Sequence, residues 1–476
     1  MAQAAALIGA LGAVLVLVTS RRGTVLAGLA AIGAAVLLFQ AAGGTAISPV
    51  KATLGLAGVL VLAAAAVLFV RLPELVPLLV LVAAPFRLPL DIGSQHRLYV
   101  GIAQGGQIGR LLPLYGVVGA AALASVWQLA RGAAVRPLPR EIAVPIAALV
   151  AFASVSYLWS DVTASATNLL EFFTLPLVVL VFVVSQSPFP DWMPRMLGVI
   201  AVALAALFAG VGLIEQGTRE LIFYTPAVQV GNAYSSFFRV TSLFRDPSLY
   251  GRHVVLGLAV VLAIAWYARI RLAIAVGLVV FLFAGLFFSY SQSSLAALFA
   301  VALLVVIVAG DRPLRLGAAV IAVLVIAAGG ALVANKAASA GTQRATSDRS
   351  RRIELTAKVI AHHPLVGVGI GSQPYASQGE SKDGGPAALF VSHTTPLTVL
   401  AELGIIGFSV YLALLAGATR ALARVWRLDR VFGLALGGVF VALFVHSCFY
   451  SGFFEDPITW LVFGITASFL SARAAT

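Results

Sequence analysis

Residues 272–289 read LAIAVGLVVFLFAGLFFS and contain no charged side chain. The arginines Arg269 and Arg271 stand directly before this apolar stretch. As a helix, a run of about 20 such residues crosses the hydrocarbon core of a bilayer, which is roughly 30 Å thick. The stretch therefore predicts a transmembrane helix.

The same pattern recurs along the 476 residues of the chain. The chain is 61% hydrophobic and 10% charged, whereas a soluble domain has about 25% charged residues, so its polar side chains cannot cover it in water. We therefore expect an all-α polytopic membrane protein. The apolar segments lie at 4–19, 24–40, 52–70, 73–86, 111–129, 141–158, 168–185, 194–215, 253–269, 272–289, 294–310, 316–334, 394–417, 431–449 and 457–471.

The composition also bears on the kinds of site to expect. Cys448 is the only cysteine, so an intramolecular disulfide is impossible. The six histidines do not stand at zinc-ligand spacings, and we expect neither a metal nor a cofactor. The net charge of +13 is not a nucleic-acid signal here, because cytoplasmic loops of membrane proteins are rich in Lys and Arg.

Short basic loops set the expected orientation. Four of them carry clustered arginines, and alternating spans place all four on one side, which should be cytoplasmic. The protein is therefore expected in the cytoplasmic (inner) membrane, with loops 87–110, 159–167, 216–252, 335–393 and 451–456 outside and the C-terminus inside. The arginines concerned are Arg131, Arg136, Arg140, Arg269, Arg271, Arg312, Arg315, Arg420, Arg424, Arg427 and Arg430.

Two of the outer loops are long and basic. The loop at 335–393 holds seven Lys or Arg against four acids, and the loop at 216–252 holds four arginines against two acids. Two interpretations stay open. Long loops are partly exempt from the topological charge bias, or the arginines bind an anionic ligand at the outer membrane surface.

Inside the larger loop, residues 351–364 predict an amphipathic helix. Ile353, Ala357 and Ile360 stand at i, i+4 and i+7 and would form its apolar face, and Pro364 would end it. An apolar turn with alternate glycines follows at 365–371, and such glycines permit a tight turn or a close backbone approach. The turn lacks the strand and helix of a nucleotide-binding fingerprint.

The loop ends at His393, where the next span begins. Thr395 is expected to cap that helix and Pro396 to be its first residue. His393 would then lie above a helix N-terminus, whose positive dipole favours a neutral imidazole that can accept a proton. The alternative is an interfacial histidine that only caps the helix or forms a hydrogen bond.

These motifs together resemble the O-antigen ligase and O-antigen polymerase family. The specific part is His363-Pro-Leu-x-Gly-x-Gly-x-Gly371, followed by His393 and by Glu402-x-Gly-x-x-Gly407. The segments Arg239–Gly251 and Ser289–Ser294 are similar to two further motifs of the family, and the resemblance covers roughly residues 73–471. It implies a bundle like that of GT-C-type glycosyltransferases, with about 12 core spans, up to three N-terminal spans and a partly helical external loop.

The resemblance also implies a division of the chain. Residues 1–72 would form N-terminal spans outside the family pattern, and 73–334 the transmembrane core with the external loop 216–252. Residues 335–393 would be the large periplasmic loop, and 394–476 the C-terminal spans of the core.

The activity that the resemblance implies is glycan transfer. Members of the family move a glycan from an undecaprenyl-diphosphate carrier to an acceptor hydroxyl on the outer face of the cytoplasmic membrane, with inversion and without a metal. The acceptor is a lipid-anchored sugar for ligases and a carrier-linked repeat for polymerases. The partners would be these lipid-linked glycans and membrane lipids, without nucleic acid, and the motif does not separate ligase from polymerase.

The resemblance assigns expected roles to individual residues. His393 would be the catalytic base, and the diphosphate would bind a set of polar side chains. Gln292 stands where many ligases have an arginine, so phosphate neutralisation would fall on the arginines. Ser291 and Glu402 would give support, with Glu402 about 13 Å along the helix from His393 and on roughly the opposite face. The expected diphosphate contacts are Arg239, Arg245, Gln292, Arg351 and Arg352.

Two other functions remain possible at this point. A transporter or flippase for lipid-linked glycan would show repeated halves with broken helices near the midplane, and the sequence has no convincing internal repeat. A non-enzymatic scaffold could bind anionic lipid head groups through the basic loops. His446, Ser447, Glu455 and Asp456 are expected to form a polar network at the outer helix ends, with a role in the site as the less favoured interpretation.

Overall fold

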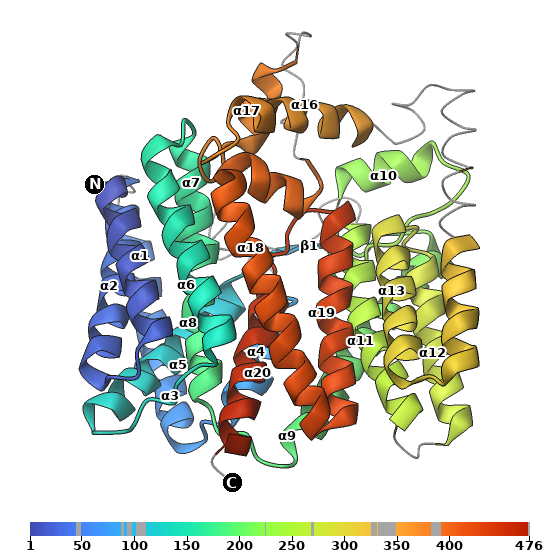
Figure 1. The fold of residues 1–476 in the computed structure, drawn as a ribbon, viewed down its shortest axis with the longest axis horizontal. Coiled ribbons are helices and arrows are strands. Elements are labelled where there is room, and N and C mark those ends of the chain that lie inside the picture. Colours follow the sequence, from blue (N-terminus) through green and yellow to red (C-terminus); the bar gives the residue numbers. More distant parts are fainter. Residues whose placement is uncertain are drawn as a thin grey trace.

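The computed structural model describes residues 1–43, 49–86, 90–92, 98–100, 111–223, 225–267, 271–324, 331, 349–381 and 392–474. Within these ranges the chain forms a bundle of long helices (Figure 1). Nine of the described helices are long and apolar enough to cross a membrane, and Ala2–Val18, Gly58–Arg71 and Leu272–Phe287 are shorter apolar helices. The predicted all-α polytopic membrane fold is confirmed.

The helices of the bundle follow the predicted apolar segments closely. They are α1 (Ala2–Val18), α2 (Arg22–Ala42), α3 (Pro49–Arg71), α4 (Leu75–Ala83), α5 (Leu112–Ala130), α6 (Arg140–Val155), α7 (Thr163–Leu169), α8 (Leu175–Gln186), α9 (Met193–Thr218), α11 (Pro247–Tyr267), α12 (Leu272–Phe287), α13 (Gln292–Ala309), α18 (Thr395–Leu428), α19 (Arg430–Phe449) and α20 (Pro457–Ala474). Three further helices lie at one end of the bundle: α10 (Pro226–Ala233), α16 (Arg349–His362) and α17 (Gln373–Gly379) (Figure 1).

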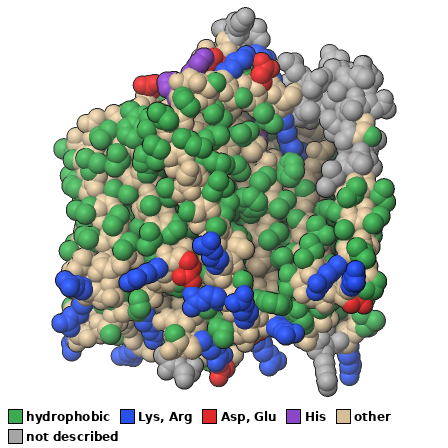
Figure 2. All heavy atoms as spheres, in the orientation of Figure 1, with side chains coloured by type: hydrophobic (Ala, Val, Ile, Leu, Met, Phe, Trp, Pro, Cys, Tyr) green, Lys and Arg blue, Asp and Glu red, His purple; other side chains and the backbone are tan. Residues whose placement is uncertain are grey.

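Charge is distributed unequally between the two ends of the bundle. In Figure 2, Lys and Arg side chains gather along the lower rim, below a broad hydrophobic band. The C-terminus lies at this lower end, and α16 and α17 cover the opposite end (Figure 1). The end that carries the loop at 349–381 is called the outer end below.

The predicted span at 73–86 is wrong in length. Its helix α4 has nine residues, which at 1.5 Å per residue cover about 13 Å and cannot cross a bilayer. A two-stranded antiparallel hairpin, β1 (Leu90–Ile92) and β2 (Leu98–Val100), follows in the predicted loop. Of the predicted span at 316–334, residues 316–324 are helical, and most of the rest, with 335–348 and 382–391 of the large loop, lies outside the described residues.

The predicted span at 394–417 is not one continuous helix. Gly404 has φ 61° and ψ −167°, which breaks α18 into an outer helix before it and a long helix that continues to Leu428. The break leaves carbonyl groups of the outer helix without intrahelical partners. Those of Ala401 and Glu402 accept hydrogen bonds from the N–H groups of Val368 and Gly369, at 3.0 and 2.9 Å.

This backbone contact explains why glycine stands at positions 367 and 404. A Cβ atom at Gly404 would overlap the backbone of Leu365, and one at Gly367 would overlap the backbone of Glu402. The N–H of Ile405 donates to the carbonyl of Pro364 at 2.9 Å, so the two segments pair in both directions. The glycine turn after α16 is thereby fixed against the break in α18.

Candidate functional site

His393 and Arg352 lie in direct contact at the outer end. Nη1 of Arg352, on α16, is 2.5 Å from Nε2 of His393, which stands two residues before α18. A guanidinium has donors only, so Nε2 accepts and the proton of the neutral ring is assigned to Nδ1. The two residues are 41 positions apart in the chain, and the sequence named both as candidates without placing them together.

His393 is poised as a neutral imidazole. Burial lowers its pKa below the ordinary value of 6.5, the cations of Arg352 and Arg349 lower it further, and Asp246 opposes the shift. Its backbone φ of 55° lies in the left-handed region, which costs a non-glycine residue energy and is common at functional sites. The predicted cap is wrong by one residue, because Thr394 is the N-cap and Thr395 is the first helical residue.

Asp246 and Tyr450 complete one side of the site. The ring of Tyr450 lies 5.9 Å from that of His393. Its hydroxyl donates to Oδ2 of Asp246 at 3.0 Å. Oδ1 of Asp246 accepts from the N–H groups of Ser248 and Leu249 at 2.7 and 2.9 Å, in the first turn of α11. Asp246 is therefore held from two sides.

Arg239 belongs to the same region. Its Nε donates to the carbonyl of Ser289 at 3.2 Å, and its backbone N–H donates to Asn232 at 2.8 Å. Burial lowers the pKa of Arg239, and the attraction of Asp246 opposes this shift. An arginine stays charged in proteins. Asp246 therefore lies near enough to act electrostatically on both Arg239 and His393.

Glu215, at the end of α9, anchors the segment that carries Arg239. Its side chain is fully buried. Oε2 accepts from the N–H groups of Thr241 and Ser242 at 2.8 and 2.7 Å, and Oε1 from that of Ile222 at 2.8 Å. One carboxylate thus binds both ends of the loop between α9 and α11, and so positions Arg239.

Gln373, the first residue of α17, connects the parts of the site. Its Nε2 donates to the hydroxyls of Thr356 and Ser377 at 3.1 and 2.9 Å. Its Oε1 accepts from the N–H of Ser392 at 3.2 Å, directly before His393. Thr356 in turn donates to the carbonyl of Arg352 at 2.8 Å. The buried amide thereby fixes α16 and the His393 segment relative to each other.

The buried face of α16 differs from the predicted one. The predicted apolar face contained Ile353, but that side chain is 44% exposed. The buried side chains are Leu355, Thr356 and Val359. The helix is oriented by the polar contact between Thr356 and Gln373 as well as by apolar burial, so a pattern of apolar residues alone selects the wrong face.

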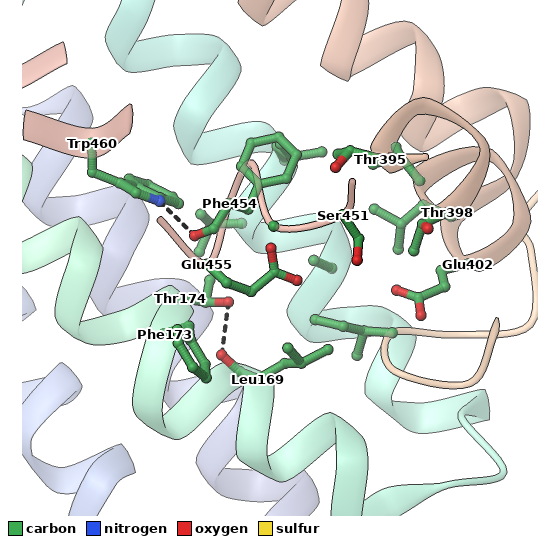
Figure 3. Close-up of a pocket in the computed structure, with 17 residues that line it drawn as sticks. Leu169, Phe173, Thr174, Thr395, Thr398, Glu402, Ser451, Phe454, Glu455 and Trp460 are labelled. Carbon is green, nitrogen blue, oxygen red and sulfur yellow. Dashed lines mark hydrogen bonds between the residues drawn. The ribbon is translucent and has the colours of Figure 1, made fainter. Parts of the chain in front are cut away.

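Glu402 is buried and paired with backbone. Its Oε1 accepts from the N–H of Gln373 at 3.3 Å, and the amide of Gly371 also donates to this carboxylate. It therefore holds the glycine turn and α17 rather than contacting His393. With Glu455 it also lines a cavity below the site (Figure 3).

Ser291 and Gln292 mark the start of α13. Ser291 is the N-cap, and its hydroxyl accepts from the N–H of Ser294 at 3.3 Å. It also lies 3.1 Å from the hydroxyl of Ser293, which is 3.2 Å from Nε2 of His446. Gln292, in the place of the expected arginine, is exposed.

The remaining predicted phosphate contacts differ in their surroundings. Arg245 is exposed and directly precedes Asp246. Arg351 donates to the hydroxyl of Ser381 at 3.1 Å, toward the loop after α17. Of the predicted set, the structure brings together His393, Arg352 and Arg239. Arg351, Gln292 and Glu402 stand apart from this group, whereas Ser291 reaches Arg239 through Ser289, whose hydroxyl accepts from the N–H of Ser291 and whose carbonyl accepts from Arg239.

The residues of the predicted polar network at the outer helix ends bind different partners. Asp456, before α20, makes a buried ion pair of 2.6 Å with Arg252 of α11. His446 instead contacts Ser293 and the carbonyl of Ser248, at 3.2 and 3.1 Å. Among the described residues, no group of three or more His, Cys, Asp or Glu side chains is arranged to hold a metal ion.

Three site residues were missed by the sequence reasoning. Asp246 stood inside a quoted motif, where only the arginines were considered. Tyr450 closes an apolar run, and nothing in that run distinguishes it from an interfacial tyrosine. Gln373 follows the glycine turn without a recognisable motif. Each becomes visible only when α11, α17 and α19 are packed together.

A family model described as O-antigen ligase matches residues 277–412. The match runs from α12 to the part of α18 beyond the break at Gly404, and it contains Arg352, Gln373, His393 and Glu402. The predicted resemblance to the O-antigen ligase and polymerase family is confirmed over these residues, which make up less than a third of the chain. No curated protein matches the chain.

Proposed function

From the O-antigen ligase family assignment, we propose that this protein is a membrane glycosyltransferase. It moves a glycan from an undecaprenyl-diphosphate carrier to an acceptor hydroxyl at the outer face of the cytoplasmic membrane, as an O-antigen ligase or polymerase. The observation that carries the proposal is the contact between Arg352 and His393. In this proposal the guanidinium of Arg352 binds the diphosphate, and the neighbouring imidazole of His393 accepts the proton of the acceptor hydroxyl.

In this scheme the arginines bind and stabilise the leaving group. A lipid diphosphate leaves readily when its developing negative charge is stabilised, and guanidinium groups stabilise phosphate oxygens through paired, charge-assisted hydrogen bonds. Arg239 and Arg352 are the proposed contacts, with Arg349 adding positive potential near His393. They supply the positive charge, so no metal is needed in this scheme.

His393 takes the proton of the acceptor. In the structure Nε2 is occupied by Arg352. When the donor binds, the diphosphate attracts Arg352 and releases Nε2, which then accepts a hydrogen bond from the acceptor hydroxyl. The hydroxyl oxygen attacks the anomeric carbon, the bond from that carbon to the diphosphate breaks, and the diphosphate leaves with the electron pair. The proton passes to His393, and the single displacement inverts the anomeric carbon.

The expected orientation agrees with this chemistry. The clustered arginines of the short loops mark the cytoplasmic side by the positive-inside rule, and Lys and Arg gather at the end of the bundle away from α16 and α17 (Figures 1 and 2). The site would then face the periplasm, where the carrier presents its glycan.

The experiment uses the purified protein in liposomes that contain carrier-linked glycan and a lipid-anchored or carrier-linked acceptor. Glycosyl transfer predicts release of carrier diphosphate together with a lengthened acceptor. A flippase predicts translocation of the intact donor without release, and that result would replace the proposal. A scaffold predicts neither. A variant at the exposed His363, which directly follows α16, serves as a histidine control.

A further inference from the structure

His446 is a buried histidine that the proposed chemistry does not use. It lies near the end of α19, four residues before Tyr450, and its side chain is fully buried. Nε2 lies 3.1 Å from the carbonyl oxygen of Ser248 and 3.2 Å from the hydroxyl of Ser293. Nδ1 has no hydrogen-bond partner within the part of the chain that the structure describes. One nitrogen thus connects α19 to both α11 and α13.

These contacts assign the tautomer of His446. A carbonyl oxygen only accepts hydrogen bonds, so Nε2 carries the ring proton and donates it to the carbonyl of Ser248. A proton on Nδ1 would instead leave a buried N–H group unpaired, which is costly. The neutral ring is therefore a hydrogen-bond donor directed at the first turn of α11.

The carbonyl of Ser248 is a meeting point of three helices. Besides the contact from α19, it accepts a hydrogen bond at 3.3 Å from the hydroxyl of Ser294, in the first turn of α13. A Cβ atom at Gly251 would lie 2.6 Å from that hydroxyl oxygen, so the close approach of α11 to α13 requires glycine there. Figure 1 shows α11 and α13 beside α19, and the first turn of α11 is held by both neighbours.

The segment held in this way carries Asp246. Its Oδ1 accepts from the N–H groups of Ser248 and Leu249 at 2.7 and 2.9 Å, and its Oδ2 accepts from the hydroxyl of Tyr450 at 3.0 Å. Tyr450 directly follows α19, and its ring lies 5.6 Å from that of His446. A shift of the first turn of α11 relative to α19 would therefore separate Asp246 from Tyr450.

Asp246 and Tyr450 in turn lie beside the proposed base. The ring of Tyr450 is 5.9 Å from that of His393. Burial and the cations of Arg352 and Arg349, on α16, lower the pKa of His393, whereas the carboxylate of Asp246 raises it. The position of Asp246 is thus measurable as a change in the titration of His393.

We propose that His446 is a positioning residue for the transfer reaction, which fixes the first turn of α11 to α19 and so keeps Asp246 and Tyr450 beside His393. Because its side chain is fully buried, it acts through these two residues and not by contact with a substrate. This inference rests on the proposed function for its catalytic meaning, but the arrangement that it claims can be measured without turnover.

The test measures the pKa of His393 by NMR in the full-length protein, held in lipid nanodiscs and labelled at histidine. The chain has six histidines, and the signal that His393→Gln lacks belongs to His393. His446→Leu removes the donor to Ser248, whereas His446→Gln keeps an N–H donor of similar reach. The control is Ser447→Ala, which removes an equally buried hydroxyl that donates to the carbonyl of Phe444 within α19 at 2.7 Å.

In His446→Leu the pKa of His393 should fall by roughly half a unit, the effect of one negative charge moved away in a medium of high dielectric constant. His446→Gln and Ser447→Ala should keep the wild-type value. The kcat of transfer should fall severalfold in His446→Leu, with little change in the KM for donor. If His446→Leu does not fold, His446→Asn takes its place, because its shorter amide does not reach Ser248.

The proposal is overturned if the pKa of His393 stays the same or rises in His446→Leu, or if it falls equally in His446→Gln or Ser447→Ala. A wild-type kcat in His446→Leu also overturns it. A wild-type protein that transfers no glycan would count against the proposed function instead, and the titration would still decide whether His446 holds Asp246 in place.

Discussion

Arg352 donates a hydrogen bond from Nη1 to Nε2 of His393 over 2.5 Å, so a cation occupies the lone pair of the proposed base. Burial and this contact together favour the neutral imidazole, and the contact links the two halves of the proposed chemistry. It also couples donor binding to activation of the base, because a diphosphate competes with His393 for the guanidinium.

The first prediction concerns the pH dependence of transfer. The pKa of His393 lies below 6.5, and a base works only when unprotonated, so activity should be full above that pKa and fall as the pH drops through it. In Arg352→Gln the loss of a nearby cation raises the pKa of His393, and the acid limb should move to higher pH. A pH profile of kcat measures this. Arg351→Gln, whose guanidinium contacts Ser381, is the control and should move less. An acid limb that stays in place in Arg352→Gln would argue against the coupling.

The second prediction concerns the donor. Arg239→Met should weaken binding of undecaprenyl diphosphate roughly 10- to 100-fold, since a hydrogen bond to a charged group contributes about 1.5–3 kcal/mol. Competition by undecaprenyl diphosphate against carrier-linked glycan measures the change. Lys358→Met removes an exposed cation that pairs with Glu354 at 2.9 Å and should leave binding nearly unchanged. Equal affinity in Arg239→Met and wild type would remove Arg239 from the diphosphate site.

The third prediction concerns Gln373. Gln373→Met keeps the approximate volume but removes the side-chain hydrogen bonds to Thr356, Ser377 and Ser392. Unsatisfied buried partners cost about 1–3 kcal/mol, so thermal stability should fall. More specifically, kcat should fall while the KM for donor changes little, because His393 loses its position relative to Arg352. The partly buried Gln378→Met is the control. A variant that unfolds earlier but keeps the wild-type kcat would show that Gln373 is only structural.

The fourth prediction concerns the break in α18. Gly404→Ala places a Cβ at φ 61° and against the backbone of Leu365. A non-glycine residue in a strained conformation costs on the order of 1–3 kcal/mol, and the overlap adds to this. Thermal unfolding should begin at a lower temperature. Gly437→Ala, in α19 where a new Cβ meets nothing within 4 Å, should be neutral or stabilising. Equal stability of the two variants would mean that the outer helix does not depend on the break.

Much of the fold could be predicted because the bilayer imposes a simple rule. A span such as 272–289 is recognised by length and lack of charge, and the observed α12 covers nearly the same residues. The rule gave a wrong prediction for the short α4, because its residues are as apolar as those of a full span. The break at Gly404 could not be predicted either, because the carbonyls it releases bind Val368 and Gly369 in a different segment.

The site was predictable in its residue types and not in its geometry. His393 was found through its place before a span, and Arg352 through its place in a basic loop. Their contact depends on how α16 packs, and α16 is oriented by Thr356 and Gln373 rather than by the apolar residues that sequence reasoning used. Asp246 was overlooked because only the arginines of its loop were considered as candidates, yet its carboxylate binds Tyr450, which directly follows α19.

The most direct measurement of the central claim is single-turnover transfer by His393→Gln in liposomes loaded with carrier-linked glycan. Glutamine retains hydrogen bonding but cannot take the proton. If His393 is the base, the rate should fall about 10²- to 10⁴-fold, the usual contribution of general base catalysis, while undecaprenyl diphosphate still binds with affinity near that of wild type. A variant that transfers glycan at the wild-type rate would contradict the account.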